Sequence, residues 1–141
     1  MNKYKAVLDF VKTYPYAAGN NFYFNFVDET NNDGNTALLT VPYGQQVKKY
    51  VDGVRLLKMQ FEIRQTKPLE QDANTSANAE AMQSVKEFLD WINEQGENRN
   101  FPVWDSEIVG MSTGENLDPI ITGVSDNGAL YGFPFDIYYI E

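Results

Sequence analysis

The sequence predicts an α+β fold: a mostly antiparallel sheet with two helices packed on one face and a protruding β-hairpin. Two segments place apolar residues at helical spacing, and several others alternate apolar and polar side chains as strands do. An Asp-Gly pair between two alternating segments indicates a hairpin. The length of 141 residues fits a single domain, 1–141, in which folding buries roughly two-thirds of the surface of the unfolded chain.

The N-terminal part predicts one helix and two strands. Residues 3–14 have apolar side chains at helical spacing, and Pro15 ends the pattern. The aromatic run at 22–27 and the apolar run at 37–41 are typical of strands. Between them, the residues from Asp28 to Thr36 form a polar loop. Glu29, Asn31 and Asp33 have the spacing of ligands in a calcium loop, but Thr40 stands where the last carboxylate ligand is needed. The polar residues of this loop are therefore better explained as the residues that a hairpin loop prefers.

The strongest hairpin signal joins residues 45–51 to residues 54–66 through Asp52-Gly53, which favours a two-residue type I′ turn. From Leu57 to Arg64 apolar and polar residues alternate cleanly, but nearer the turn the order fails. In the two-residue register Lys49 faces Leu56, so apolar and basic side chains share both faces. Two interpretations follow: a bulge near Leu56-Leu57 with a solvated end, or an arm that another subunit covers.

The C-terminal half predicts a polar loop at 67–78, a helix at about 77–95 and strands at 101–112, 119–124 and 129–140. Ser76 or Asn78 can cap the helix, and Gly96 is expected just past its end. Six apolar residues form the helix stripe: Ala81, Met82, Val85, Phe88, Leu89 and Ile92. The sequon Asn74-Thr75-Ser76 is better explained as part of the polar loop.

Composition excludes several functions. The chain has no cysteine and no histidine, which removes disulfides, thiolate chemistry and the commonest general base and transition-metal ligand. No signal peptide is recognisable, and no apolar run approaches the ~20 residues that span a bilayer. We therefore expect a protein that is soluble and cytoplasmic when made, with no membrane partner.

Charge is distributed unevenly along the chain. The net charge is −9, which argues against broad nucleic-acid binding. Yet residues 48–67 contain six of the 11 basic residues and two acids, a net charge of +4, and leave −13 for the remainder. The hairpin is thus a basic island on an acidic protein.

No enzyme is expected. Carboxylate pairs such as Asp105 with Glu107 or Asp90 with Glu94 arise easily among 20 acidic residues. The sequence contains no phosphate-binding glycine loop and no Gly-x-Ser-x-Gly motif. It nominates no catalytic, cofactor-binding or metal-binding residue.

Several residues are better candidates for a subunit interface. Near the turn, neither face of the hairpin can lie against a dry core. Trp91 lies off the stripe of its helix, and the last strand has large apolar side chains on both faces; such amphipathic aromatic residues are enriched at interfaces. The candidates are Lys48, Lys49, Tyr50, Arg55, Leu56, Trp91, Tyr138 and Ile140.

Four features together resemble a known family: the short N-terminal helix, the hairpin KKYVDGVRLLKMQFEI at 48–63, the long helix ending in LDWI at 89–92, and the final strand GFPFDIYYI at 132–140. The chain resembles the minor capsid proteins of long-tailed bacteriophages of Gram-positive hosts, which in turn resemble siphophage tail terminators. The loops at 28–35 and 111–118 have no counterpart in that pattern.

The resemblance implies a virion protein of the tail-neck region, assembled in the host cytoplasm. It implies a ring, usually hexameric, that caps the tail tube, ends tail polymerisation and provides the surface for joining the head. The implied partners are other copies of the chain, the tail tube protein and a head-completion or connector protein, while DNA passes through without specific binding. The alternatives are a head-tail connector or another neck protein and, less favoured, a nucleic-acid-binding module that uses the basic hairpin.

Overall fold

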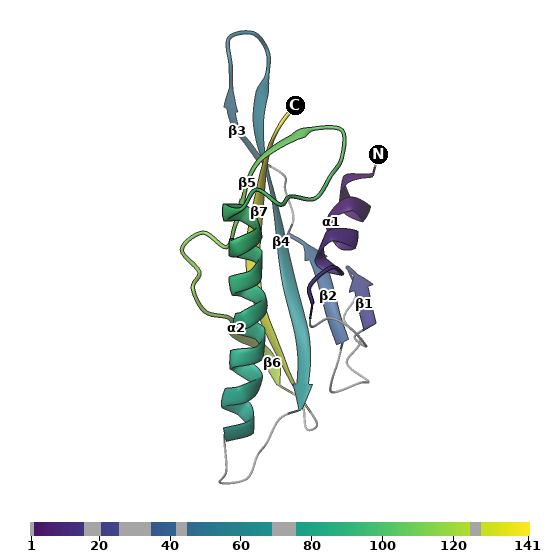
Figure 1. The fold of residues 1–141 in the computed structure, drawn as a ribbon, viewed down its shortest axis with the longest axis vertical. Coiled ribbons are helices and arrows are strands. Elements are labelled where there is room, and N and C mark those ends of the chain that lie inside the picture. The colour runs from purple at the N-terminus through teal and green to yellow at the C-terminus, as the bar shows by residue number, and fades with distance from the viewer. Residues whose placement is uncertain (1, 16–20, 26–34, 42–44, 69–75, 125–127) are drawn as a thin grey trace.

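The structure is a computed structural model that describes residues 2–15, 21–25, 35–41, 45–68, 76–124 and 128–141. Two helices and seven strands lie in these residues (Figure 1). They are α1 (Lys3–Val11), β1 (Asn21–Phe24), β2 (Asn35–Thr40), β3 (Gln45–Lys49), β4 (Arg55–Pro68), α2 (Ser76–Glu97), β5 (Glu107–Ser112), β6 (Ile120–Val124) and β7 (Gly128–Ile140).

The strands form one sheet with β4 and β7 at its centre. These two long strands pair antiparallel from Leu56 opposite Ile140 to Pro68 opposite Gly128. The main order is β1-β2-β4-β7-β5, while β3 pairs with β4 and β6 pairs with β7. Among the described pairs, β1 with β2 alone is parallel. The prediction of a mostly antiparallel sheet is therefore confirmed.

Both helices cover the same face of the sheet, as predicted (Figure 1). The core lies between them and alternate residues of the central strands. Burying each large apolar side chain contributes about 1.5–3 kcal/mol relative to leaving it exposed. The fully buried members are Leu38, Phe61, Ile63, Tyr131, Phe133, Phe135 and Ile137 from the sheet, and Val7, Val11, Val85, Phe88, Leu89 and Ile92 from the helices.

Helix α1 begins and ends close to its predicted bounds. Asn2 is the N-cap, and its Oδ1 accepts hydrogen bonds from the amides of Tyr4 and Lys5 at 3.0 and 3.1 Å. Such a cap satisfies amide groups that the first helical turn leaves unpaired. The helix ends at Val11, earlier than the predicted residue 14.

Helix α2 is longer than predicted at both ends. It begins at Ser76, so Asn78 lies inside the helix and is not its N-cap. Gly96 also lies inside the helix, and the prediction that it follows the helix end is wrong. The residue with a left-handed backbone after the helix is Arg99, whose φ is 59°. The amide of Arg99 donates to the carbonyl of Gly96, and the amide of Asn100 donates to the carbonyl of Gln95, which is a Schellman arrangement.

The predicted strand at 101–112 is shorter in the structure, because β5 begins at Glu107. The preceding segment buries Trp104, whose ring lies 5.4 Å from that of Tyr139. It therefore closes one end of the core instead of extending the sheet. The predicted loop at 67–78 is also shorter, since β4 continues to Pro68 and α2 begins at Ser76.

Some predictions concern residues outside the described ranges. These are the calcium-like positions Glu29, Asn31 and Asp33 and residues 74–75 of the sequon.

Candidate assembly interface

The hairpin between β3 and β4 has a three-residue loop, not the predicted two-residue turn. The amide of Tyr50 donates to the carbonyl of Val54 at 2.7 Å, and the amide of Gly53 donates to the carbonyl of Tyr50 at 3.0 Å. Gly53 has a φ of 91°, in the region that glycine enters without steric cost. Asp52 Oδ1 accepts from the amide of Val54 at 3.1 Å. This loop makes Lys49 the partner of Arg55, one residue from the predicted register.

The irregularity predicted near Leu56-Leu57 lies on the opposite strand. In β3, Gln46 pairs with Leu57 and Lys48 pairs with Leu56, so Val47 is the extra residue of a bulge. The pairing of β4 with β7 runs from Leu56 to Pro68 without a shift. The alternation of apolar and polar residues in β4 therefore changes near the turn because the strand is covered differently there. The strand itself continues without a bulge.

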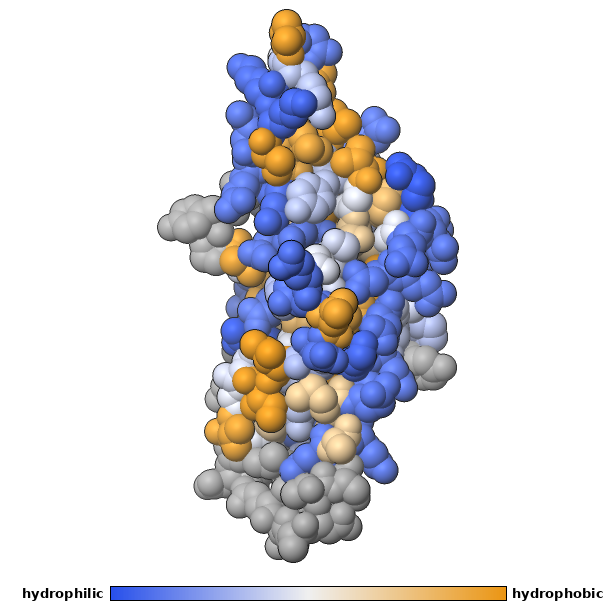
Figure 2. All heavy atoms as spheres, turned by 90° about the vertical axis from the view of Figure 1, so that its left-hand side faces the viewer, coloured by the Kyte–Doolittle hydropathy of each residue, from blue (hydrophilic) through white to orange (hydrophobic). Residues whose placement is uncertain are grey.

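We call residues 45–55 the arm. All five residues of β3 are exposed, as are the loop residues Val51, Asp52 and Gly53. The arm extends past the ends of both helices (Figure 1), and hydrophobic atoms lie at its far end (Figure 2). Asp52 and Gly53 lie at the exposed tip of the arm, as expected for a protruding hairpin.

The base of the arm is fixed to the end of β7. The amide of Arg55 donates to the carbonyl of Glu141 at 2.8 Å, and the amide of Glu141 donates back to Arg55 at 3.0 Å. Residues 50–54 project beyond this pair. The arm is therefore a continuation of the central sheet with a short free end.

The basic side chains of the arm have no acidic partner among the described residues. Lys48, Lys49 and Arg55 form no ion pair there, and the Nζ of Lys48 lies 5.0 Å from the centroid of the Tyr50 ring. In the body of the sheet, by contrast, Lys58 lies 3.7 Å from Asp136 and Arg64 lies 3.0 Å from Glu62. Within the described part of the chain, the positive charge of the arm is thus not neutralised by an ion pair.

The sheet face away from the helices holds three more predicted candidates. Leu56 pairs with Ile140, and Lys58 pairs with Tyr138, so Leu56, Tyr138 and Ile140 share this face at the base of the arm. All three are partly buried, and the two described helices lie on the other face. The structure brings these residues next to Lys48, Lys49, Tyr50 and Arg55 in one region.

Trp91 is placed elsewhere. Its ring lies 5.3 Å from the ring of Phe10 and 5.3 Å from that of Tyr14, between α1 and α2. The residue packs against the core although it lies off the apolar stripe of α2. Trp91 is therefore partly covered within its own subunit, and its place at a subunit interface stays a prediction.

An open pocket of about 310 Å³ lies between α1 and the strands β1, β2 and β4. Lys3 lines it, and its Nζ donates to the hydroxyl oxygen of Tyr139 at 3.2 Å. Burial acts to lower the pKa of Lys3, but the hydrogen bond and nearby tyrosines raise it overall. No carboxylate lines this pocket, and the described residues contain no group of three possible metal ligands.

No protein-family model matches this chain, and a search of curated proteins finds no significant similarity. No described helix is both long enough and apolar enough to span a bilayer. The likeness to phage minor capsid proteins thus rests on the sequence motifs.

The sequence analysis missed one exposed apolar surface. Leu117, Ile120, Ile121 and Val124 are all exposed, on β6 and the segment that precedes it. The signal was present in the uncharged run PIITGV at 119–124, which also suits an internal strand. These side chains are exposed because β6 lies at an edge of the sheet. That position depends on the strand order, which the run itself does not reveal.

Proposed function

We propose that this chain is a structural assembly protein of a long-tailed bacteriophage. It forms a ring, usually of six copies, that caps the tail tube, ends tail polymerisation and provides the surface for joining the head. DNA passes through the ring without specific binding. The sequence motifs suggest the phage role, and the exposed basic arm is the observation that carries the argument for assembly.

The arm has the properties of a contact surface. A sheet extension with exposed Val47, Tyr50 and Val51 does little for the stability of its own subunit, because apolar side chains contribute when they are buried. The unpaired cations beside them favour an acidic partner. Large exposed apolar side chains rimmed by charge are typical of protein interaction sites.

The same chain offers an acidic counterpart. Helix α2 contains five acidic residues and one basic residue, Lys86, and its acids Glu80, Glu87, Asp90, Glu94 and Glu97 are exposed. Attraction between the arm of one copy and an acidic surface of the next joins two different patches. Such head-to-tail contacts generate rings when the rotation closes.

Native mass measurement combined with electron microscopy of assembled tails tests the proposal. We expect an assembly whose mass is an integral multiple of the chain, six for a hexamer, and tails of uniform length when the protein is present. Tails of normal length without it, lacking heads, would favour the connector role instead. A chain that stays monomeric and does not bind tube ends would contradict the proposal.

A charge reversal on the arm separates assembly from folding. The double variant Lys49→Glu, Arg55→Glu should fold normally and lose assembly, because both side chains are exposed. Lys12→Glu is a charge-reversal control outside the arm, since Lys12 is an exposed lysine directly after α1. Equal loss in both variants would indicate a general charge effect. Salt-sensitive DNA binding that depends on the arm, without ring formation, would favour the nucleic-acid-binding alternative.

A further inference from the structure

Strand β6 is an apolar edge strand without a charged residue. Its exposed side chains Ile120, Ile121 and Val124 have exposed fractions of 60%, 48% and 65%, and Leu117 just before it has 68%. Natural edge strands are commonly guarded by charged residues, especially lysine, against pairing with another chain. The sequence IITGV has no charge. Charged protection of this kind is therefore absent from β6.

The outer edge of β6 is open in the described part of the chain. Its strand partner there is β7, from Ile120 opposite Gly132 to Val124 opposite Ala129. A bulge between Ile121 and Gly123 places Thr122 outside the ladder, and its hydroxyl donates to the carbonyl of Leu130 at 3.3 Å. The main-chain groups on the far side can accept another strand or loop.

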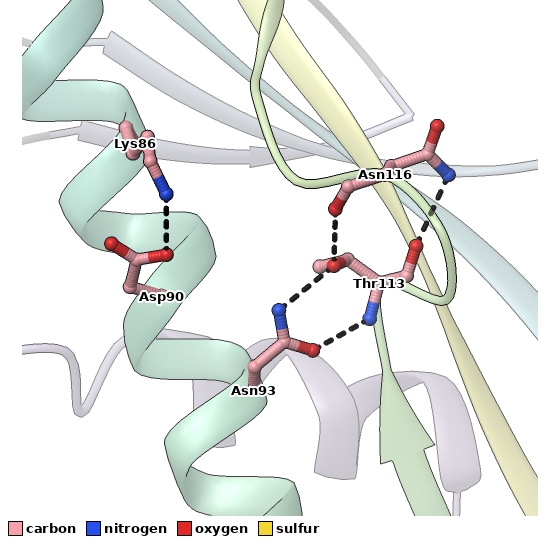
Figure 3. A network of polar contacts seen from close by, with 5 residues as sticks. All are labelled: Lys86, Asp90, Asn93, Thr113 and Asn116. Carbon is pink, nitrogen blue, oxygen red and sulfur yellow. Dashed lines mark hydrogen bonds and ion pairs between the residues drawn. The ribbon is translucent and has the colours of Figure 1, made fainter.

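The segment before β6 is held by a polar network (Figure 3). Asn93 of α2 accepts from the amide of Thr113 at 2.9 Å and donates to its hydroxyl oxygen at 2.8 Å. The hydroxyl of Thr113 in turn donates to the carbonyl of Asn116 at 2.6 Å. Leu117 and Asp118 follow directly, so the network restricts where they can lie before any partner binds. Such preorganisation lowers the entropic cost of association.

The charges around β6 are mainly acidic. Glu115 and Asp118 are exposed in the segment before the strand, and Asp90 and Glu94 are exposed on the neighbouring part of α2. The basic residue in this region is Lys86, whose Nζ lies 2.9 Å from Asp90. A positively charged partner with apolar side chains fits this surface.

We propose that the β6 surface, residues 115–124, receives the arm of a second copy of this chain. The arm presents Val47 and Val51 beside Lys48 and Lys49, which match the apolar strand and its acidic border. This proposal rests on the proposed function and adds the surface of the neighbouring copy that the arm contacts.

The positions of the two surfaces suit a head-to-tail contact. The arm lies on the side of β4 opposite to β7, whereas β6 lies on the side of β7 opposite to β4. The two surfaces are therefore at opposite edges of the sheet. One copy can use the two surfaces at once with two different neighbours, as a ring or filament requires.

Cross-linking between introduced cysteines tests the contact, because the chain contains no cysteine of its own. Val51→Cys and Ile121→Cys are made as separate proteins, mixed in equal amounts and treated with a bis-maleimide. We expect a covalent dimer that contains one copy of each variant. Val103→Cys replaces Ile121→Cys as the control, since Val103 is 73% exposed but lies outside β6. The control should give several-fold less product.

A charged edge residue provides the second measurement. Ile120→Lys should remove assembly while circular dichroism stays unchanged, because the side chain is exposed in the monomer. Val103→Lys, the control, should assemble normally. In a charge exchange, Asp118→Lys and Lys49→Glu should each weaken assembly, and the double variant should recover part of it.

The outcomes separate the two proposals. Assemblies that form normally with Ile120→Lys and show no Val51–Ile121 product would overturn β6 as the receiving surface and leave the ring intact. Cross-linking of Ile121→Cys to itself would indicate pairing between two β6 strands and would overturn the arm as the occupant. A chain that remains monomeric at all concentrations and does not bind tube ends would overturn both.

Discussion

Gly96 of α2 lies directly against the carbonyl oxygen of Met111 in β5, so closely that a methyl group at Gly96 would overlap that oxygen. The obstructing atom belongs to the main chain of a paired strand, so it cannot turn aside as a flexible side chain can. This contact sets how closely the end of α2 approaches β5.

Gly96→Ala should lower the free energy of unfolding by about 1–3 kcal/mol, the usual cost of overpacking. Alanine favours a helix over glycine by only about 0.5–1 kcal/mol, which does not offset the overlap. Urea unfolding followed by circular dichroism measures the change. Gln83→Ala, at an exposed position of the same helix, should alter stability by no more than about 0.5 kcal/mol. A Gly96→Ala variant as stable as the original chain would show that α2 shifts without cost.

The Asn93–Thr113 contact should hold the segment before β6. Asn93→Ala leaves the amide and hydroxyl of the buried Thr113 without that partner and should cost about 1–3 kcal/mol. Hydrogen exchange at residues 113–118 should rise more than in the rest of the chain. Lys86→Ala is the control, because it removes an exposed ion pair with Asp90 about two turns earlier in α2. It should lower the free energy of unfolding much less. Equal exchange in both variants would argue against the network.

Alkaline pH should destabilise the protein through Tyr131. Burial raises the pKa of its hydroxyl above the ordinary value of 10.0, since the anion is disfavoured in the folded state. Below pH 10 the hydroxyl is protonated in both states and stability is unaffected. As the pH rises above that value, the unfolded chain loses its proton first and unfolding becomes more favourable.

Tyr131→Phe should therefore reduce the loss of stability between pH 9 and pH 11, measured by urea unfolding across that range. The raised pKa of Lys3 acts in the same direction and remains in this variant, so part of the loss should persist. Tyr50→Phe, at an exposed position on the arm, is the control and should leave the profile unchanged. Identical profiles for Tyr131→Phe and the original chain would exclude this contribution.

The sequence by itself determined the features that depend on local periodicity. The apolar stripe of α2 and the alternation from Leu57 to Ile63 each predicted their element and its buried face, because a helix and a strand repeat at fixed periods. Asp52-Gly53 marked the hairpin end, since few other residue pairs allow so tight a reversal. The cluster of basic residues at 48–67 follows directly from the order of charged residues in the sequence.

The tertiary structure decided the features that depend on contacts between distant segments. The hairpin register changed by one residue because Gly53, not Asp52-Gly53 together, supplies the left-handed position, and Val47 forms the bulge. Trp91 is partly covered by the rings of Phe10 and Tyr14, a contact that no pattern within α2 reveals. Ile120 and Ile121 are exposed because strand order places β6 at an edge. Periodicity fixes which side of an element is apolar, but only packing decides what, if anything, covers it.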